Sequence, residues 1–222
     1  MNLHKALCAS TALTAVLLSG TAYPANTTYT GNTSAGNATI TNNSGDLTSF
    51  QDTSQGGTAN ITNNIGGETD FINSSTAQNA TITNLGGLTL FRDASNAGSA
   101  TITNGTGGLT RFFSGTTAQN ATIINNSSGA TQFEGSSSAG SASITNNAGT
   151  LRFIDTATAG NSTIINTAGG NTFFVNGNTA GSANITNDGG NTEFDSTSTA
   201  GSASFTNVNN GRISFLNSST GG

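Results

Sequence analysis

Three aspartates at regular positions are the residues of this chain that could carry acid–base chemistry. Asp52, Asp93 and Asp155 each lie two residues after a phenylalanine. If the chain coils with a period of about 21 residues, Asp52 and Asp93 lie two coils apart, at about 9.6 Å. That separation is near the range for the two carboxyl groups of inverting glycosidases. We favour the alternative, a solvated column of Asn-like residues with an occasional charge, because Asn73 holds the same place in the coil between them.

Other kinds of catalytic site are excluded by composition. After residue 25 the sequence contains no His, Cys or Lys. Nucleophilic catalysis by Ser-His-Asp or Cys-His groups therefore has no base, and zinc has no nitrogen or sulfur ligand. No calcium-binding nonapeptide of the G-G-x-G-x-D type occurs. We predict that the protein is not an enzyme and holds no cofactor or metal.

Threonine pairs suggest a different function, the binding of ice by an ordered hydroxyl lattice. Regular Thr-x-Thr columns on a flat β-solenoid face can order water. Three repeats carry the full motif around an isoleucine: Thr39 with Thr41, Thr81 with Thr83, and Thr101 with Thr103. Asn, Ser or Ile interrupts the pattern in the other repeats, so we keep ice binding as an alternative only.

The elements that position these residues recur at a fixed interval of 20 or 21 residues. An isoleucine is followed nine or ten residues later by a phenylalanine. The first series is Ile40, Ile61, Ile82, Ile102, Ile123, Ile144, Ile164, Ile185 and Phe205. The second series is Phe50, Phe71, Phe91, Phe112, Phe133, Phe153, Phe174, Phe194 and Phe215. Such a period is typical of repeat architectures, which present a long surface and no deep pocket.

One repeat shows the local pattern. Ala100, Ile102 and Asn104 alternate with two threonines, a period of two that predicts a strand with one inward face. A Gly-rich break precedes a second strand near residues 109–112, and residues 113–118 predict a third, weaker strand. Short strands at this period indicate an all-β fold, a parallel β-solenoid (β-helix) of about nine rungs of 20–21 residues. Neighbouring rungs share their buried faces, so no single rung would fold alone.

An asparagine lies two residues after each member of the isoleucine series. At a strand end its amide can donate to one neighbouring rung and accept from the other, as in stacked β-structures, and it tolerates a left-handed turn. We predict a structural ladder and not a polar binding stripe. Its members are Asn42, Asn63, Asn84, Asn104, Asn125, Asn146, Asn166, Asn187 and Asn207.

The chain divides into three parts. Residues 1–25 have a charged start, a short apolar stretch and small residues before Ala25, and predict a secretory signal peptide. Residues 26–34 are an N-terminal lead-in or cap, and residues 35–222 form the repeat domain. After residue 25, four arginines stand against ten acidic residues, about −6 at neutral pH. This negative net charge argues against nucleic acid as a partner, because nucleic-acid binding requires a basic surface. We also expect no transmembrane segment in the mature chain.

The motif A-G-[SN]-A-x-I-x-N…G-G-x-T-x-F, seen in residues 97–112 and 180–194, resembles repeats in the passenger regions of Gram-negative autotransporter-like surface proteins. The resemblance covers residues 35–222 and implies a right-handed β-helix exported to the bacterial surface. The alternating strands of a translocator barrel are not seen in this sequence. The last rung shows no atypical capping repeat, so we also expect end-to-end self-association through it.

From these observations we expect a non-enzymatic exported protein, secreted or held at the bacterial cell surface. Its expected function is display, adhesion or spacing, with host-cell, matrix or polysaccharide surfaces as partners. The alternatives are an ice-binding solenoid and, more remotely, a polysaccharide-acting β-helix enzyme.

Overall fold

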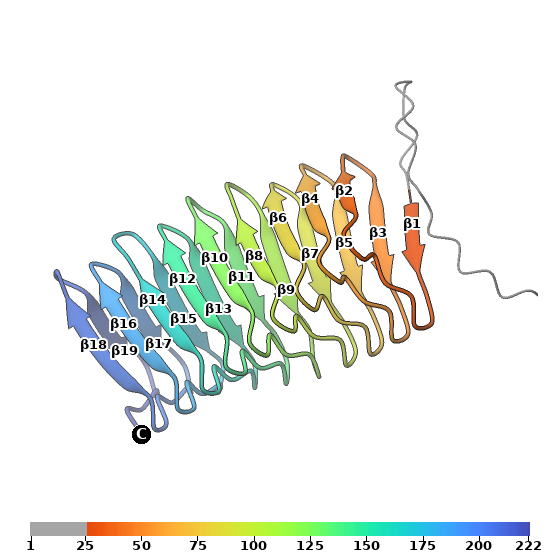
Figure 1. The fold of residues 1–222 in the computed structure, drawn as a ribbon. Coiled ribbons are helices and arrows are strands. Elements are labelled where there is room, and N and C mark those ends of the chain that lie inside the picture. The colour runs from red at the N-terminus through yellow and green to blue at the C-terminus, as the bar shows by residue number, and fades with distance from the viewer. Residues whose placement is uncertain (1–25) are drawn as a thin grey trace, which may run out of the picture.

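Each repeat contributes one strand to each of two parallel sheets, which form opposite walls of a rod (Figure 1). The computed structural model describes residues 26–222. The predicted signal peptide, residues 1–25, lies outside the described residues. The all-β parallel solenoid of about nine turns is confirmed.

The phenylalanine sheet contains the strands that end near the phenylalanine series. They are β1 (Asn26–Tyr29), β3 (Leu47–Phe50), β5 (Glu68–Phe71), β7 (Leu88–Phe91), β9 (Leu109–Phe112), β11 (Ala130–Phe133), β13 (Thr150–Ile154), β15 (Asn171–Val175), β17 (Asn191–Phe194) and β19 (Arg212–Phe215).

The isoleucine sheet contains the strands that carry the isoleucine series. They are β2 (Thr39–Asn42), β4 (Asn60–Asn64), β6 (Thr81–Leu85), β8 (Thr101–Asn104), β10 (Thr122–Asn126), β12 (Ser143–Asn147), β14 (Thr163–Asn166), β16 (Asn184–Asp188) and β18 (Ser204–Val208). Within residues 26–222, no helix has the length and hydropathy needed to cross a membrane.

Every strand pairs with its equivalent one repeat later, so like residues lie above one another. Ile102 is in register with Ile123, and Phe112 with Phe133. The phenylalanine rings stack face to face, with centroids 4.5 to 5.0 Å apart from Phe50 to Phe194. These eight rings are completely buried. Burying each large side chain contributes about 1.5–3 kcal/mol, so the two apolar columns supply most of the driving force for stacking.

The aromatic column begins one half-rung before the first complete repeat. β1 pairs in register with β3, and Tyr29 stacks on Phe50 with ring centroids 4.7 Å apart. The segment that we assigned as a lead-in, residues 26–34, therefore contains the first strand of the phenylalanine sheet. Tyr29 precedes Phe50 by 21 residues, so the spacing alone could have predicted this strand. Tyr replaces Phe there, and within residues 26–222 no isoleucine strand precedes β1.

The predicted third strand at residues 113–118 is wrong. Only Thr117 of this segment forms a β-bridge, and tight turns flank it. Gly115 and Gln119, two residues to either side, have positive φ angles of 84° and 51°. A strand cannot continue through left-handed residues, so the third side of each rung is reduced to one bridged residue.

A glycine in each turn between the two sheets is required because the backbone of the preceding rung passes too close for a side chain. A Cβ on Gly108 would lie 2.2 Å from the carbonyl oxygen of Asn84. Asp46 holds this place between β2 and β3, and within residues 26–222 no earlier rung supplies an isoleucine strand beneath it. The equivalent glycines, each with a Cβ position 2.0 to 2.6 Å from such an oxygen, are Gly67, Gly87, Gly108, Gly129, Gly149, Gly170, Gly190 and Gly211.

We expect Gly108→Ala to lower the free energy of unfolding by about 1–3 kcal/mol, because the backbone must shift to relieve the contact. Gly105→Ala in the same turn is the matched control. Its Cβ would meet nothing closer than Leu85 Cδ2 at 3.4 Å. Denaturant unfolding of both variants measures the difference, and equal losses would contradict the close approach at Gly108.

Candidate functional surfaces

The asparagine column is buried inside the turn between the two sheets. Each Nδ2 donates to the Oδ1 of the asparagine one repeat later, at 2.6 to 2.9 Å, from Asn42 to Asn207. Asn63 to Asn187 are fully buried, whereas Asn207 in the last rung is exposed.

Threonines of the phenylalanine sheet complete the hydrogen bonding of the ladder. Thr110 Oγ1 donates to Asn104 Oδ1 at 2.9 Å and accepts from Asn84 Nδ2 at 3.1 Å. Asn104 Oδ1 therefore has two donors, and its Nδ2 has acceptors in Asn125 Oδ1 and Thr131 Oγ1. An amide with all its partners inside the protein cannot bind a ligand without breaking these bonds. The column acts as a structural ladder.

Leu151 takes the threonine place in one rung and is fully buried there. Because leucine has no hydroxyl group, Asn146 Oδ1 lacks the threonine donor and Asn125 Nδ2 lacks the threonine acceptor that other rungs provide. Asn125 Nδ2 keeps a contact with the Thr150 carbonyl at 3.3 Å, which other ladder asparagines make in addition to their threonine bond. The rung thus keeps the ladder bond between Asn125 and Asn146 at 2.8 Å.

The side chains of the aspartate column accept hydrogen bonds from backbone amides in the turns. Asp52, Asn73 and Asp93 have φ angles of 59° to 61° and are exposed. Asp52 Oδ2 accepts the backbone N–H of Gly31 at 2.9 Å. Asn73 and Asp93 accept the backbone N–H of Asp52 and Asn73, respectively. Asp155 shares the left-handed conformation. Each side chain thus supports the turn of the preceding rung, and an asparagine does the same work.

The outward residues of the isoleucine sheet form two columns of side chains, small and polar except at Ile124 and Ile165, which we call the threonine face. One column contains Thr39, Asn60, Thr81, Thr101, Thr122, Ser143, Thr163, Asn184 and Ser204, and all of these are exposed. The other contains Thr41, Thr62, Thr83, Thr103, Ile124, Thr145, Ile165, Thr186 and Thr206. The three complete Thr-x-Thr pairs lie on this face, but one rung, in which Asn60 replaces a threonine, separates the first pair from the other two.

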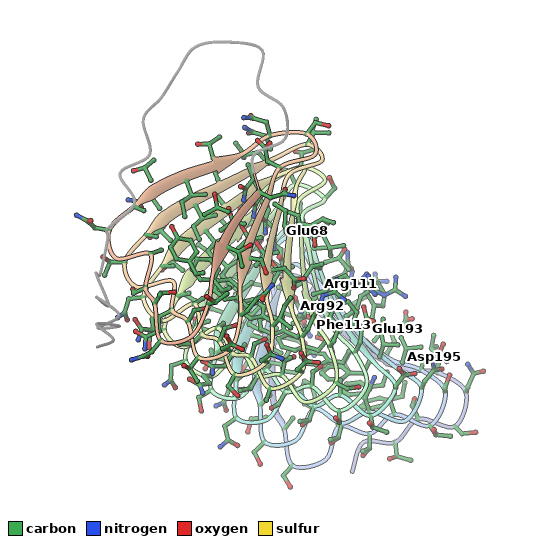
Figure 2. All side chains as sticks on the ribbon, turned by 90° about the vertical axis from the view of Figure 1, so that its right-hand side faces the viewer. Glu68, Arg92, Arg111, Phe113, Glu193 and Asp195 are labelled. Carbon is green, nitrogen blue, oxygen red and sulfur yellow. The ribbon has the colours of Figure 1, made fainter. Side chains whose placement is uncertain are left out.

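The outward residues of the phenylalanine sheet differ in kind, and we call them the charged face. In each rung they are the residues three positions before, one position before and one position after the member of the phenylalanine series, which we call the column phenylalanine. This face carries all four arginines after residue 25 together with Glu68, Asp70, Glu134, Glu193 and Asp195. Figure 2 shows the labelled members following one another along one side of the rod.

The centre of the charged face is a cluster built around Phe113. The Cζ atoms of Arg92 and Arg111 lie 4.8 and 4.6 Å from its ring centroid. Arg92 Nε pairs with Asp70 at 3.1 Å, and Arg111 pairs with Glu134 at 2.7 Å through Nε. Cation–π contacts at partly exposed sites contribute about 0.5–1 kcal/mol each. The cluster therefore fixes four charged side chains in place on an otherwise flat sheet.

Asp70 is the most covered carboxylate of this cluster, with 8% of the residue exposed. Burial raises the pKa of Asp70 above its ordinary value, and this effect exceeds the lowering of the pKa by Arg92. The folded protein therefore binds the Asp70 proton more tightly than the unfolded chain. The contribution of Asp70 to stability is present below its unfolded pKa of about 3.8 and is lost as pH rises through the higher folded pKa.

We expect Asp70→Asn to change stability in a pH-dependent way. As pH falls from 7 to below 4, the wild-type protein should gain stability relative to Asp70→Asn, because only the wild type can take up the proton. Thermal unfolding of both proteins across this range measures the difference. A difference in melting temperature that stays constant with pH would contradict the burial effect at Asp70.

The sequence predicted the asparagine column but did not reveal the Phe113 cluster. Its signal was the confinement of all four arginines to positions near the phenylalanine series. Among the described residues, no group of three or more Asp, Glu, His or Cys side chains could hold a metal ion.

No protein-family model, curated protein or solved structure matches this chain.

Proposed function

We propose that this protein is a non-enzymatic, exported β-solenoid that presents an extended surface for adhesion or display at a bacterial cell surface. The observation that carries the proposal is that inward and outward positions differ in kind. Every inward column serves stacking, hydrogen bonding or close approach, whereas the variable residues gather on the charged face.

The chemistry of the outward faces supports a binding role over catalysis. The aspartates that lie two rungs apart are hydrogen-bonded to backbone amides, and residues 26–222 hold no metal-ligating cluster. A rod of nine rungs at about 4.8 Å is roughly 40 Å long. Such a rod can hold polar, aromatic and charged groups at fixed spacing away from its point of attachment.

Binding assays with immobilised cells, matrix proteins and polysaccharides test this proposal. We expect the full chain to bind at least one of these surfaces without cleaving it. Arg152→Ala with Phe173→Ala should weaken binding, because Arg152 lies over the Phe173 ring on the charged face, 5.5 Å from its centroid. Thr122→Ala with Thr163→Ala on the threonine face is the matched control. Indifference to every surface would leave only a spacer, and cleavage of a polysaccharide would contradict the non-enzymatic part.

Ice binding is the second candidate because the threonine face is rich in hydroxyl groups. Its two columns contain twelve threonines, in the places given above. A thermal hysteresis measurement decides the matter directly. Hysteresis that disappears in Thr81→Lys and persists in a charged-face variant would favour this function, and its absence in the wild-type protein would exclude it.

A further inference from the structure

Along the rod, the net charges of successive strands on the charged face form a series. Written in reverse order beside itself, this series places opposite charges next to each other. From β5 to β19 the outward side chains contribute net charges of about −2, +1, +1, −1, +1, 0, −2 and +1, counting Asp and Glu as −1 and Arg as +1. When this series is read backwards against itself, every non-zero pair has opposite signs. The first strand, with −2, then meets the last, with +1, and the second, with +1, meets the seventh, with −2.

A two-fold axis parallel to the strands, placed between β11 and β13, produces this alignment. It sets the charged faces of two copies against each other with the rods pointing in opposite directions. The operation keeps the order of the three outward columns, so each column faces its own equivalent. β5 then opposes β19, β7 opposes β17, β9 opposes β15, and β11 opposes β13. Such an isologous contact closes as a dimer and cannot extend into a fibre.

The alignment brings specific charges together, column by column. Glu68 and Arg212 both stand three residues before a column phenylalanine, in β5 and β19, and so face each other. Arg92 and Asp195 both stand one residue after a column phenylalanine, in the rungs of β7 and β17. Each of these two pairs occurs twice in the dimer because the contact is symmetric.

The same alignment joins apolar and aromatic side chains. Ile72 and Leu216 are both one residue after a column phenylalanine, and 43% of Leu216 is exposed in the single rod. The pairs of this kind are Ile72 with Leu216, Phe113 with Val175, and Arg111 with Phe173.

Two carboxylates face apolar residues in this alignment. Glu134 lies opposite Ile154 but keeps its ion pair with Arg111. Glu193 lies opposite Leu90 and is one rung from Arg111 of the second copy. Neither carboxylate is therefore left without a neighbouring arginine.

A dimer with the rods pointing in the same direction has the opposite electrostatics. The two-fold axis then runs along the rods, and each residue of the middle column faces itself. Asp70, Arg111, Arg152 and Glu193 each belong to that column, so four like-charged pairs would be buried. Like charges set directly opposite each other across an interface cost several kcal/mol, and this arrangement is excluded.

The contact is large enough for a specific dimer of modest affinity. Eight strands at about 4.8 Å spacing and about five residues at about 3.3 Å cover roughly 600 Å² on each copy. The total of about 1,200 Å² lies at the lower limit of standard-size interfaces.

We propose that the charged face is a self-recognition surface, through which two copies of this chain pair face to face with their rods antiparallel. The occupant of this face is a second copy in the alignment that sets Glu68 against Arg212. The dimer uses the same charged face as the proposed adhesion, so self-pairing and adhesion would compete for it.

Charge reversal with compensation tests the pairing, with the full chain studied by sedimentation equilibrium at low salt. We expect the wild-type protein to dimerise, and added salt to weaken the dimer. Glu68→Arg and Arg212→Glu should each raise the dimer Kd about 10-fold or more, since each reversal acts at two symmetric places. The double variant should return to within about 3-fold of the wild type, because the pair is restored in reverse. Asp188→Arg, an equal charge change on the isoleucine sheet, should leave the Kd unchanged.

Cysteine cross-linking tests the direction of the rods, in a Cys8→Ser background. Ile72→Cys with Leu216→Cys should form disulfide-linked dimers, since these positions oppose each other only in the antiparallel alignment. Glu68→Cys with Ile72→Cys is the matched control, because those columns face each other only in the parallel alignment. Circular dichroism confirms that each variant is folded. A monomeric wild type, a double reversal as weak as the single ones, or cross-linking confined to the control would overturn the proposal.

Discussion

Phe112→Ala is expected to lower the free energy of unfolding by about 3–5 kcal/mol, the usual loss for a fully buried phenylalanine. The ring lies between Phe91 and Phe133, with centroids 4.5 and 4.6 Å away. Its removal leaves a cavity in a column whose backbone is held by hydrogen bonds on both sides, so the neighbouring rings cannot close the gap. In a repeat protein the loss acts on two interfaces between rungs. Denaturant unfolding is therefore expected to show a lower midpoint, or separate transitions for the two halves.

Phe113→Ala is the matched control, because Phe113 is the next residue and points outward. It loses contacts with two guanidinium groups, and we expect a cost of about 1 kcal/mol. Equal effects at the two positions, or an unchanged stability of Phe112→Ala, would show that the aromatic column is not the core of the rod.

Asn104→Ala is expected to lower the free energy of unfolding by about 3 kcal/mol or more. The change removes the acceptor of both Asn84 Nδ2 and Thr110 Oγ1, and it removes a donor from Asn125 Oδ1 and Thr131 Oγ1. All of these groups are buried, and a buried polar group left without a partner costs about 1–3 kcal/mol. Thermal and denaturant unfolding measure the loss.

Asn147→Ala supplies the control for the ladder. Asn147 follows a ladder residue in sequence but is exposed, and its Nδ2 donates to Oδ1 of the half-buried Asn126 at 3.0 Å. Water can replace that bond, so we expect a change within about 0.5 kcal/mol. If Asn104→Ala were as mild as Asn147→Ala, the buried ladder would contribute nothing to stability.

The sequence predicts the columns of this fold because each column is a single residue type repeated at one spacing. Ile102 and Phe112 mark the two sheets, Asn104 marks the strand end, and their repetition sets the register without any long-range information. The burial of Leu151, which takes the place of a threonine such as Thr110 in the phenylalanine sheet, also follows from the pattern. An apolar residue at that place indicates that the position faces inward.

Other features depend on geometry that the pattern does not contain. The segment around the bridged residue Thr117 has a composition that a short strand could have. Only the left-handed residues on either side of Thr117 prevent a strand from forming there. The role of Thr110 as a partner of the asparagine ladder requires knowing that the two strands of a rung converge at the turn. The burial of Asp70 under Arg92 depends on side-chain packing between rungs.

The charged face explains why the outward positions of this rod are not uniform. The threonine face repeats small polar residues, whereas the phenylalanine sheet carries arginines, carboxylates and apolar side chains in an order that differs from rung to rung. Stacking alone does not require that order. A surface that recognises something, whether another material or a second copy, does require it.

The vertical register of the rungs is the claim on which both surfaces depend, and nuclear Overhauser effects between phenylalanine rings test it most directly. In a phenylalanine-labelled sample, assigned by single Phe→Leu variants, we expect strong effects between Phe91 and Phe112 and between Phe112 and Phe133. The rings of each pair are 21 residues apart in sequence, but their centroids lie within 5 Å of each other in the rod. Effects between rings of non-consecutive repeats, or none at all, would contradict the stacked solenoid.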